Sequence, residues 1–188
     1  MKKRITALGL LWCLSAVMLQ AARVDTVLVR SVAMNKDVKV VYVLPDKAIG
    51  KQACPVVYLL HGYGGNARSW MQLKPELPQM ADEKGIIFVC PDGKNSWYWD
   101  SPENPAYRYE TFVTSELVKY TDGNYATIPD RKARAISGLS MGGHGALWSA
   151  IRHKDVFGAA GSMSGGVDIR PFPQNWEMSK QLGEFAAN

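Results

Sequence analysis

The hydrophobic residues of this chain fall into short runs that predict β-strands. Two runs rich in β-branched residues come first, and the polar tripeptide Asn35-Lys36-Asp37 separates them, which predicts an antiparallel hairpin over 24–34 and 38–44. Four later runs are continuously apolar, and each is followed by a glycine-rich turn: 56–60, 86–90, 133–139 and 157–163. Such runs are typical of strands buried on both faces of a parallel sheet.

The segments between these runs predict helices. Apolar residues have helical spacing over 107–120, and 142–153 is rich in small and apolar residues; 67–84, interrupted by two prolines, and 175–187 are further candidates. A hairpin followed by alternating strands and helices predicts an α/β fold with a mostly parallel sheet. In such a sheet Cys54 begins one strand and Cys90 ends another, roughly 15 Å apart along the strands. A disulfide needs Cα atoms within about 7 Å, so we expect two free thiols.

The first 22 residues predict a secretory signal peptide. The cations of Lys2-Lys3-Arg4 precede an apolar run over 5–19, and Ala21-Ala22 supplies the small residues of a cleavage site. An uncleaved membrane anchor is the alternative, but the run is shorter than the roughly 20 residues of a spanning helix. We therefore expect export to the periplasm or medium without a stable membrane anchor, which leaves 23–188 as the mature domain.

The net charge does not indicate a nucleic-acid partner. The chain has 22 basic and 17 acidic residues, a formal charge of +5, and three of the cations stand together at the N-terminus. No later stretch forms the cluster of cations that binding to phosphate backbones needs.

A candidate nucleophile lies where the third parallel run meets the following helix. The segment Gly138-Leu139-Ser140-Met141-Gly142 has the G-x-S-x-G pattern, in which the serine occupies a sharp, strained strand-to-helix turn. Glycine is needed on both sides because a side chain there would collide with neighbouring backbone. The turn presents the hydroxyl at a helix N-terminus, where backbone N–H groups and the helix dipole stabilise developing negative charge. A chance match is the alternative, and the strand and helix around the motif argue against it.

A second candidate for the same site follows an earlier strand. The loop His61-Gly62-Tyr63-Gly64-Gly65-Asn66 comes directly after the run at 56–60, and in folds of this kind that loop supplies the second amide of an oxyanion hole. The backbone N–H groups of Tyr63 and Met141 are therefore the candidate pair. We expect His61 to bond local backbone rather than to act as a base.

An aromatic and polar loop over 95–109 follows the second parallel run. Loops at the carboxyl ends of such strands line the ligand cleft. Trp97, Tyr98 and Trp99 are candidate substrate-binding residues that would form a platform for a sugar or an aromatic acyl group. The alternative is that they pack the loop onto the domain.

Four strings in this order carry a family resemblance: His-Gly-Tyr-Gly-Gly-Asn, Pro-Asp-Gly, Tyr-Glu-Thr-Phe-Val-Thr-Ser-Glu-Leu and Gly-Leu-Ser-Met-Gly-Gly-His-Gly-Ala. Over about 38–166 the chain resembles the esterase family that includes esterase D, S-formylglutathione hydrolases and tributyrin, feruloyl and acetylxylan esterases, as well as mycolyltransferases. The resemblance implies an α/β-hydrolase fold. It also implies a serine carboxylesterase, with Ser140 as nucleophile and the amides of Tyr63 and Met141 as oxyanion hole. Such an enzyme hydrolyses short-chain or carbohydrate-linked esters through an acyl-enzyme, without a metal or cofactor.

The sequence departs from the family after the run at 157–163, where members carry the triad acid and histidine on later loops. Only 22 residues follow Gly166, and the histidines after Ser140, His144 and His153, lie on the helix after the motif. The first is fixed by that helix, and the second is roughly 20 Å along it. We interpret the chain as the N-terminal portion of an esterase, lacking the final strands and most activity. A non-catalytic glycan-binding domain on a degraded scaffold and an acyltransferase of the same fold are the alternatives.

Overall fold

A computed structural model describes residues 22–184. The predicted signal peptide, except Ala22, and the last residues of the helix predicted at 175–187 lie outside the described residues. Within the described part of the chain, no helix has the length and apolar character needed to cross a membrane.

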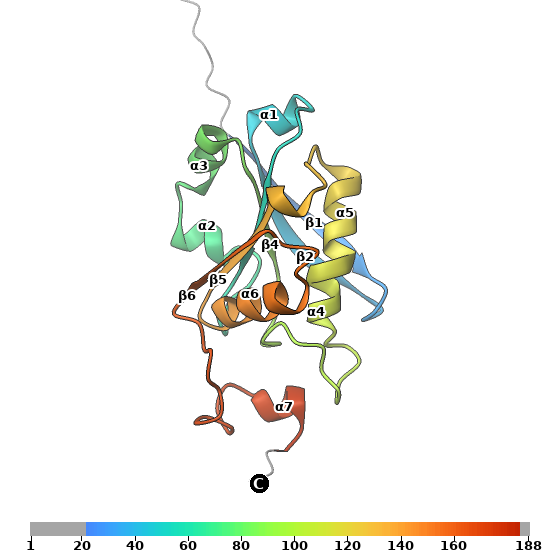
Figure 1. The fold of residues 1–188 in the computed structure, drawn as a ribbon, viewed down its shortest axis with the longest axis vertical. Helices are drawn as coiled ribbons and strands as arrows, with labels where there is room; N and C mark the ends of the chain where they lie inside the picture. The colour runs from blue at the N-terminus through green and yellow to red at the C-terminus, as the bar shows by residue number, and fades with distance from the viewer. Residues whose placement is uncertain (1–21, 185–188) are drawn as a thin grey trace, which may run out of the picture.

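One six-stranded sheet forms the centre of the domain (Figure 1), in the order β1-β2-β4-β3-β5-β6. Its strands are β1 (Arg23–Ser31), β2 (Lys36–Leu44), β3 (Val56–Leu60), β4 (Ile87–Pro91), β5 (Arg134–Leu139) and β6 (Ala159–Met163). The pairs β1–β2 and β2–β4 are antiparallel, and β3–β4, β3–β5 and β5–β6 are parallel. The predicted hairpin and the four predicted parallel strands are confirmed.

The turn of the hairpin lies earlier than predicted. Residues 32–35 form the turn, and Lys36 and Asp37 already belong to β2. Asn35 has a φ of 51° and its N–H donates to the carbonyl oxygen of Val32 at 3.2 Å. Asparagine tolerates this left-handed conformation better than a β-branched residue does, so the turn closes at Asn35 instead of beginning there.

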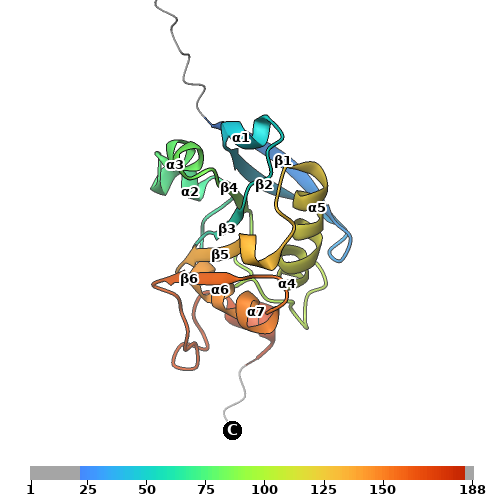
Figure 2. The same ribbon diagram turned by 45° about the horizontal axis from the view of Figure 1, so that its top comes forward.

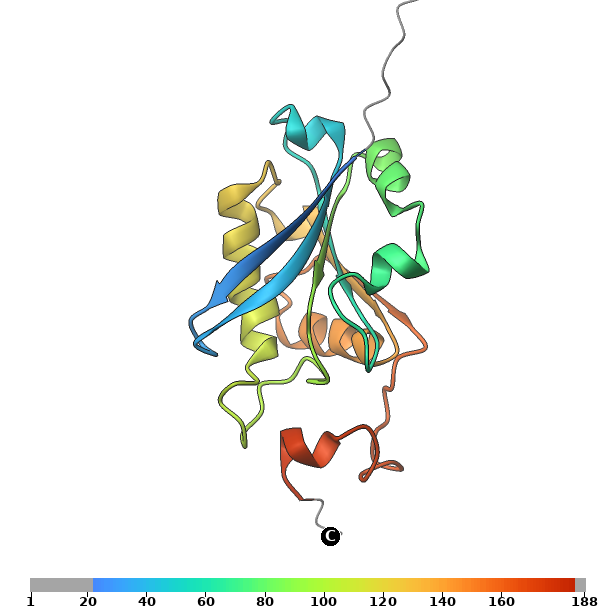
Figure 3. The same ribbon diagram turned by 180° about the vertical axis from the view of Figure 1, so that it is seen from behind.

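Helices cover both faces of the sheet (Figures 2 and 3), with α2 and α3 on one face and α5 and α6 on the other. The helices are α1 (Asp46–Ile49), α2 (Ser69–Leu73), α3 (Leu77–Lys84), α4 (Tyr109–Thr111), α5 (Leu117–Asn124), α6 (Met141–Arg152) and α7 (Met178–Leu182). A π-helical turn, Phe112–Glu116, joins α4 to α5. The helix predicted at 67–84 is two short helices, because Pro75 lies in the break between them.

Each face of the sheet has its own hydrophobic cluster. Phe88 and Leu59 pack with Trp70 of α2 and Leu77 of α3 on one face. On the other face the core includes buried side chains of α4 to α6 and of the neighbouring strands: Tyr42, Tyr58, Ile136, Phe112, Leu117 and Met141. Cys54 and Cys90 are buried free thiols, as predicted.

The strand β6 is one of the two edge strands of the sheet, and it is exposed. Four of the five β6 residues are exposed: Ala159, Ala160, Ser162 and Met163. Among residues 22–184 no strand pairs with the outer side of β6. The segment that follows β6 carries α7, which lies at the opposite end of the domain from α1 and α3 (Figure 1).

Candidate active site

Ser140 occupies the junction between β5 and α6 in a strained backbone conformation. Its φ is 55° and its ψ is −116°, a region that costs a residue with a side chain on the order of 1–3 kcal/mol. The Ser140 N–H donates to the carbonyl oxygen of Met163 at 2.8 Å, and its carbonyl oxygen accepts from the His144 N–H at 3.0 Å. The strained turn is therefore fastened to the end of β6 and to the first turn of α6.

The two glycines of the motif are required by backbone contacts. A Cβ on Gly138 would lie 2.2 Å from the carbonyl oxygen of Gly142, and a Cβ on Gly142 would lie 2.2 Å from the carbonyl oxygen of Leu60. Neither oxygen can withdraw without moving a strand or the helix. The prediction that side chains at these two positions would collide with backbone is confirmed.

The loop after β3 lies directly against the nucleophile turn. A Cβ on Gly62 would lie 3.5 Å from the Ser140 Cβ, which is ordinary contact. Among the described residues, the N–H groups of Tyr63 and Met141 donate no hydrogen bond. Met141 is the first residue of α6, so its N–H lies at the positive end of the helix dipole. Both amides remain free for a ligand oxygen, and their role as an oxyanion hole stays a prediction.

A cavity of about 270 Å³ opens beside Ser140. Aromatic residues from three segments line it: Tyr63 from the loop after β3, Trp97 from the loop after β4, and Phe172 and Trp176 from the segment after β6. The Trp97 Nε1–H donates to the carbonyl oxygen of Trp176 at 3.4 Å. The segment between β6 and α7 thus forms one wall of the space over the nucleophile.

The three aromatic residues predicted to bind substrate take different places. Trp97 lines the Ser140 cavity. The interpretation is wrong for Tyr98, whose fully buried ring lies so close to Gly93 and Gly145 that a Cβ on either would come within 2.5 Å of it. Trp99 is also buried and stacks on Trp97 with ring centroids 5.5 Å apart. Tyr98 and Trp99 therefore pack the loop onto the domain.

His61 is held between two backbone groups. Its Nε2 accepts from the Gly93 N–H at 2.9 Å, so the proton lies on Nδ1, which donates to the carbonyl oxygen of Gly62 at 2.7 Å. This neutral tautomer agrees with the separation of 3.7 Å between Nε2 and an Asp92 oxygen, longer than a hydrogen bond. The prediction that His61 bonds local backbone is confirmed.

His144 is fixed in the same way. Its Nε2 accepts from the Trp99 Nε1–H at 2.9 Å, and Nδ1 donates to the carbonyl oxygen of Gly166 at 2.7 Å. Burial lowers the pKa of His144, although the bond to Gly166 acts in the opposite direction. The ring is neutral and both nitrogens are occupied, so it offers no lone pair to Ser140.

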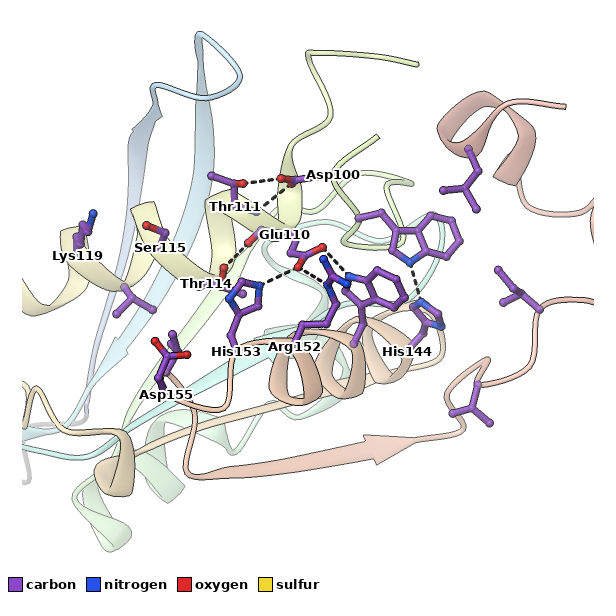
Figure 4. A pocket seen from close by; sticks show the side chains of 17 residues that line it. Asp100, Glu110, Thr111, Thr114, Ser115, Lys119, His144, Arg152, His153 and Asp155 are labelled. Carbon is purple, nitrogen blue, oxygen red and sulfur yellow. Dashed lines mark hydrogen bonds and ion pairs between the residues drawn. The ribbon is translucent and has the colours of Figure 1, made fainter. Parts of the chain in front are cut away.

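His153 belongs to a cluster around the carboxylate of Glu110 (Figure 4), in a cavity of about 1110 Å³ between α4–α5 and α6. The Glu110 oxygens accept from Trp148 Nε1 at 2.7 Å, Arg152 Nε at 2.7 Å and His153 Nε2 at 2.8 Å. Burial acts to raise the pKa of Glu110, but these hydrogen bonds outweigh it and hold the pKa below its usual value. The cluster ties α6 to α4, and His153 is committed to it.

A family model described as "Putative esterase" matches residues 31–187. The chain belongs to this esterase family. An acetyl esterase of Caldicellulosiruptor saccharolyticus is 28% identical over 132 residues, which cover 66% of this chain and 49% of that protein. The diacylglycerol acyltransferase/mycolyltransferase Ag85A of Mycobacterium leprae is 34% identical over 154 residues, covering 77% of this chain and 44% of that protein. The chain thus spans about half the length of these relatives.

Solved structures place this chain among the α/β-hydrolases. A ferulic acid esterase is 31% identical and superimposes with a TM-score of 0.72, covering 87% of this chain and 66% of that one. The predicted fold, a mostly parallel sheet with an N-terminal antiparallel hairpin, is confirmed.

No sequence pattern predicts the residues that enclose Ser140 from the segment after β6. Phe172 and Trp176 line its cavity, and Glu177 bonds the side chain of Tyr63 at 3.1 Å. No periodic pattern marks this segment, so only its aromatic residues gave any signal. In residues 22–184, no group of three or more histidine, cysteine or acidic side chains is placed to hold a metal ion.

Proposed function

We propose that this chain carries the nucleophile and the oxyanion hole of a serine carboxylesterase. The observation that supports the proposal best is the strained Ser140 turn, which the backbone contacts of Gly138 and Gly142 allow only with glycine at both positions. Strain of this kind persists only where the surrounding structure imposes it, and it concentrates at active sites.

The proposed reaction is acyl transfer in two steps. The Ser140 Oγ attacks the ester carbonyl carbon, the Oγ proton passes to a base and then to the departing alcohol, and an acyl-enzyme forms. Water then attacks the acyl carbon and releases the acid and the free serine. The amides of Tyr63 and Met141 stabilise the oxyanion of each tetrahedral intermediate. None of the three histidines is placed to be the base. Both ring nitrogens of His61 and of His144 are bonded elsewhere. His153 lies at the far end of α6 from Ser140, roughly 20 Å along the helix.

The proposed substrates are short-chain or carbohydrate-linked esters. The Ser140 cavity, at about 270 Å³, is smaller than the roughly 300–1,000 Å³ of pockets that enclose a whole drug-sized ligand. It therefore suits a short or single-ring acyl group. The names of two similar proteins, an acetyl esterase and a ferulic acid esterase, agree with that size.

Labelling with a fluorophosphonate tests the nucleophile. The chain should be modified at Ser140 faster than at Ser164, a serine that lines the same cavity, and Ser140→Ala should abolish this modification while Ser164→Ala leaves it unchanged. Peptide mapping by mass spectrometry identifies the site. Equal labelling of the two serines would overturn the proposal.

Two other functions remain in view. The absence of a described histidine placed to act on Ser140 favours a non-catalytic glycan-binding domain, which would leave Ser140 no more reactive than other serines. The similarity to a diacylglycerol acyltransferase/mycolyltransferase favours acyl transfer to an acceptor other than water, for which a sugar hydroxyl is the candidate. Product analysis with and without a sugar acceptor distinguishes acyl transfer to the sugar from hydrolysis.

Export of the chain is part of the proposal and rests on the N-terminal sequence alone. Protein isolated from the native host should begin near Ala22 or Arg23. Recovery of intact Met1 from the cytosol would contradict export.

A further inference from the structure

Two cavities lie beside the adjacent residues Trp176 and Glu177. On one side is the Ser140 cavity, whose walls are mainly aromatic and also include Ser164 and Asp168; Trp97, Phe172 and Trp176 are among its aromatic residues. On the other side is a cavity of about 380 Å³, which Glu177 itself lines. Apart from Gly64 and Gly65, its other walls carry hydrogen-bonding side chains: Lys94, Asn95, Asn104, Tyr107, Lys180 and Gln181.

The carboxylate of Glu177 is fixed by groups from three segments. One oxygen accepts from the Tyr63 hydroxyl at 3.1 Å and from the Asn95 Nδ2–H at 3.2 Å, and the other pairs with the Lys180 ammonium. These bonds hold the segment after β6 against the loop after β3. Trp176 and Glu177 have φ values of 51° and 55°, so two consecutive residues with side chains are held in the left-handed region. Such strain needs compensating contacts, and the bonds to Glu177 provide them.

The loop after β3 passes between the two cavities. Tyr63 lines the Ser140 cavity, and the next two residues, Gly64 and Gly65, line the polar cavity. An ester bound at Ser140 with its carbonyl oxygen at the Tyr63 amide would therefore have one cavity on each side. The aromatic cavity suits an apolar acyl group, whereas the polar cavity offers amide and ammonium donors and the ring of Tyr107 to a hydroxyl-rich group.

We propose that Glu177 is a specificity-determining residue that separates the two halves of the ester. It directs the acyl group into the aromatic cavity and a hydroxyl-rich alcohol, such as a sugar, into the polar cavity. This assignment rests on the proposed function, because it takes the scissile bond to lie at Ser140.

Binding of the two halves as separate probes tests the partition without needing turnover. Sodium cinnamate represents an apolar acyl group and cellobiose a hydroxyl-rich alcohol, and saturation-transfer NMR on the full chain measures each affinity. Trp176→Ala should weaken cinnamate at least about 5-fold and cellobiose less than about 2-fold. Tyr107→Ala should do the reverse.

Variants of Glu177 test the partition itself. Glu177→Ala should weaken both probes, and Glu177→Gln should restore most of both affinities, because the amide oxygen still accepts from Tyr63 and Asn95. Lys119→Ala, in the separate cavity beside α6, should change neither affinity. Circular dichroism and thermal melts confirm that each variant is folded.

The outcomes separate this proposal from the proposed function. If Trp176→Ala and Tyr107→Ala weaken both probes equally, or if the unaltered chain binds neither probe, the partition is refuted. Neither binding measurement depends on the reactivity of Ser140. A failure of Ser140 labelling would therefore remove the nucleophile while the division of the two probes still stood.

Discussion

Replacing Gly142 by alanine tests whether the nucleophile turn depends on backbone contacts. The added Cβ would lie 2.2 Å from the carbonyl oxygen of Leu60, 2.5 Å from its carbonyl carbon and 2.7 Å from the carbonyl oxygen of His61. All three atoms are backbone at the end of β3, where Leu60 pairs with Gly138 of β5. Relief of the clash therefore requires α6 to move away from the sheet, which would also move Ser140.

The expected cost exceeds that of an ordinary overpacked side chain. Extra methyl groups in a packed core typically cost about 1–3 kcal/mol, and the Gly142 contact offers no flexible side chain that could yield. Alanine recovers at most about 1 kcal/mol of helix propensity over glycine. A net loss of about 2–3 kcal/mol corresponds to a fall in Tm of roughly 4–12 °C for a domain of this size.

Gly123→Ala is the matched control, because Gly123 also lies in a helix, α5, and nothing lies within 4 Å of its added Cβ. This variant should be neutral or more stable by up to about 1 kcal/mol. Urea unfolding followed by tryptophan fluorescence gives the free energy of unfolding, and fluorophosphonate labelling reports on Ser140. Equal stability and equal labelling of the Gly142→Ala and Gly123→Ala variants would refute the reasoning.

Three further predictions concern single side chains. Burial raises the pKa of the Cys90 thiol to about 12, so iodoacetamide should alkylate it only after unfolding; rapid alkylation of the native chain would contradict this. Burial lowers the pKa of His144, so the unfolded chain binds a proton that the folded chain resists. The free energy of unfolding should therefore fall as the pH drops below about 6.5, with a smaller slope in His144→Gln, as urea titrations can show. Hydrolysis of p-nitrophenyl butyrate should be slow, since loss of a triad member typically leaves about 10³–10⁴-fold enhancement over water; fast turnover abolished by Ser140→Ala would show that one histidine does act as base.

The strands of this fold could be predicted because their burial is a property of consecutive residues. Val56–Leu60 was predicted with its observed bounds, and the other parallel strands to within two residues. The π-helical turn at Phe112–Glu116 could not be predicted, because five residues are too few to distinguish its spacing from that of an α-helix. The hairpin turn was misplaced because Asn35 closes it through a left-handed conformation, which composition alone does not locate.

The site residues also differ in whether local sequence or tertiary contacts determine their positions. Ser140 could be predicted because the glycine requirement arises within five residues and the adjoining end of β3. Phe172 and Trp176 could not, because their place depends on a contact with Trp97, about 80 residues earlier in the chain, and on the bonds of Glu177.

Both local and tertiary structure exclude the histidines as bases for Ser140. Helix geometry excludes His144 as a base, and its hydrogen bonds to Trp99 and Gly166 exclude it independently. His61 is likewise bonded at both ring nitrogens, and His153 lies at the far end of α6 from Ser140. Whatever reactivity Ser140 shows in this chain therefore measures the strained turn, the two amides and the dipole of α6 in the absence of a bonded histidine. Because Ser164 lines the same cavity, the ratio of their labelling rates isolates that contribution. A ratio near one would mean that these groups do not activate the serine, and it would overturn the assignment of Ser140 as the nucleophile.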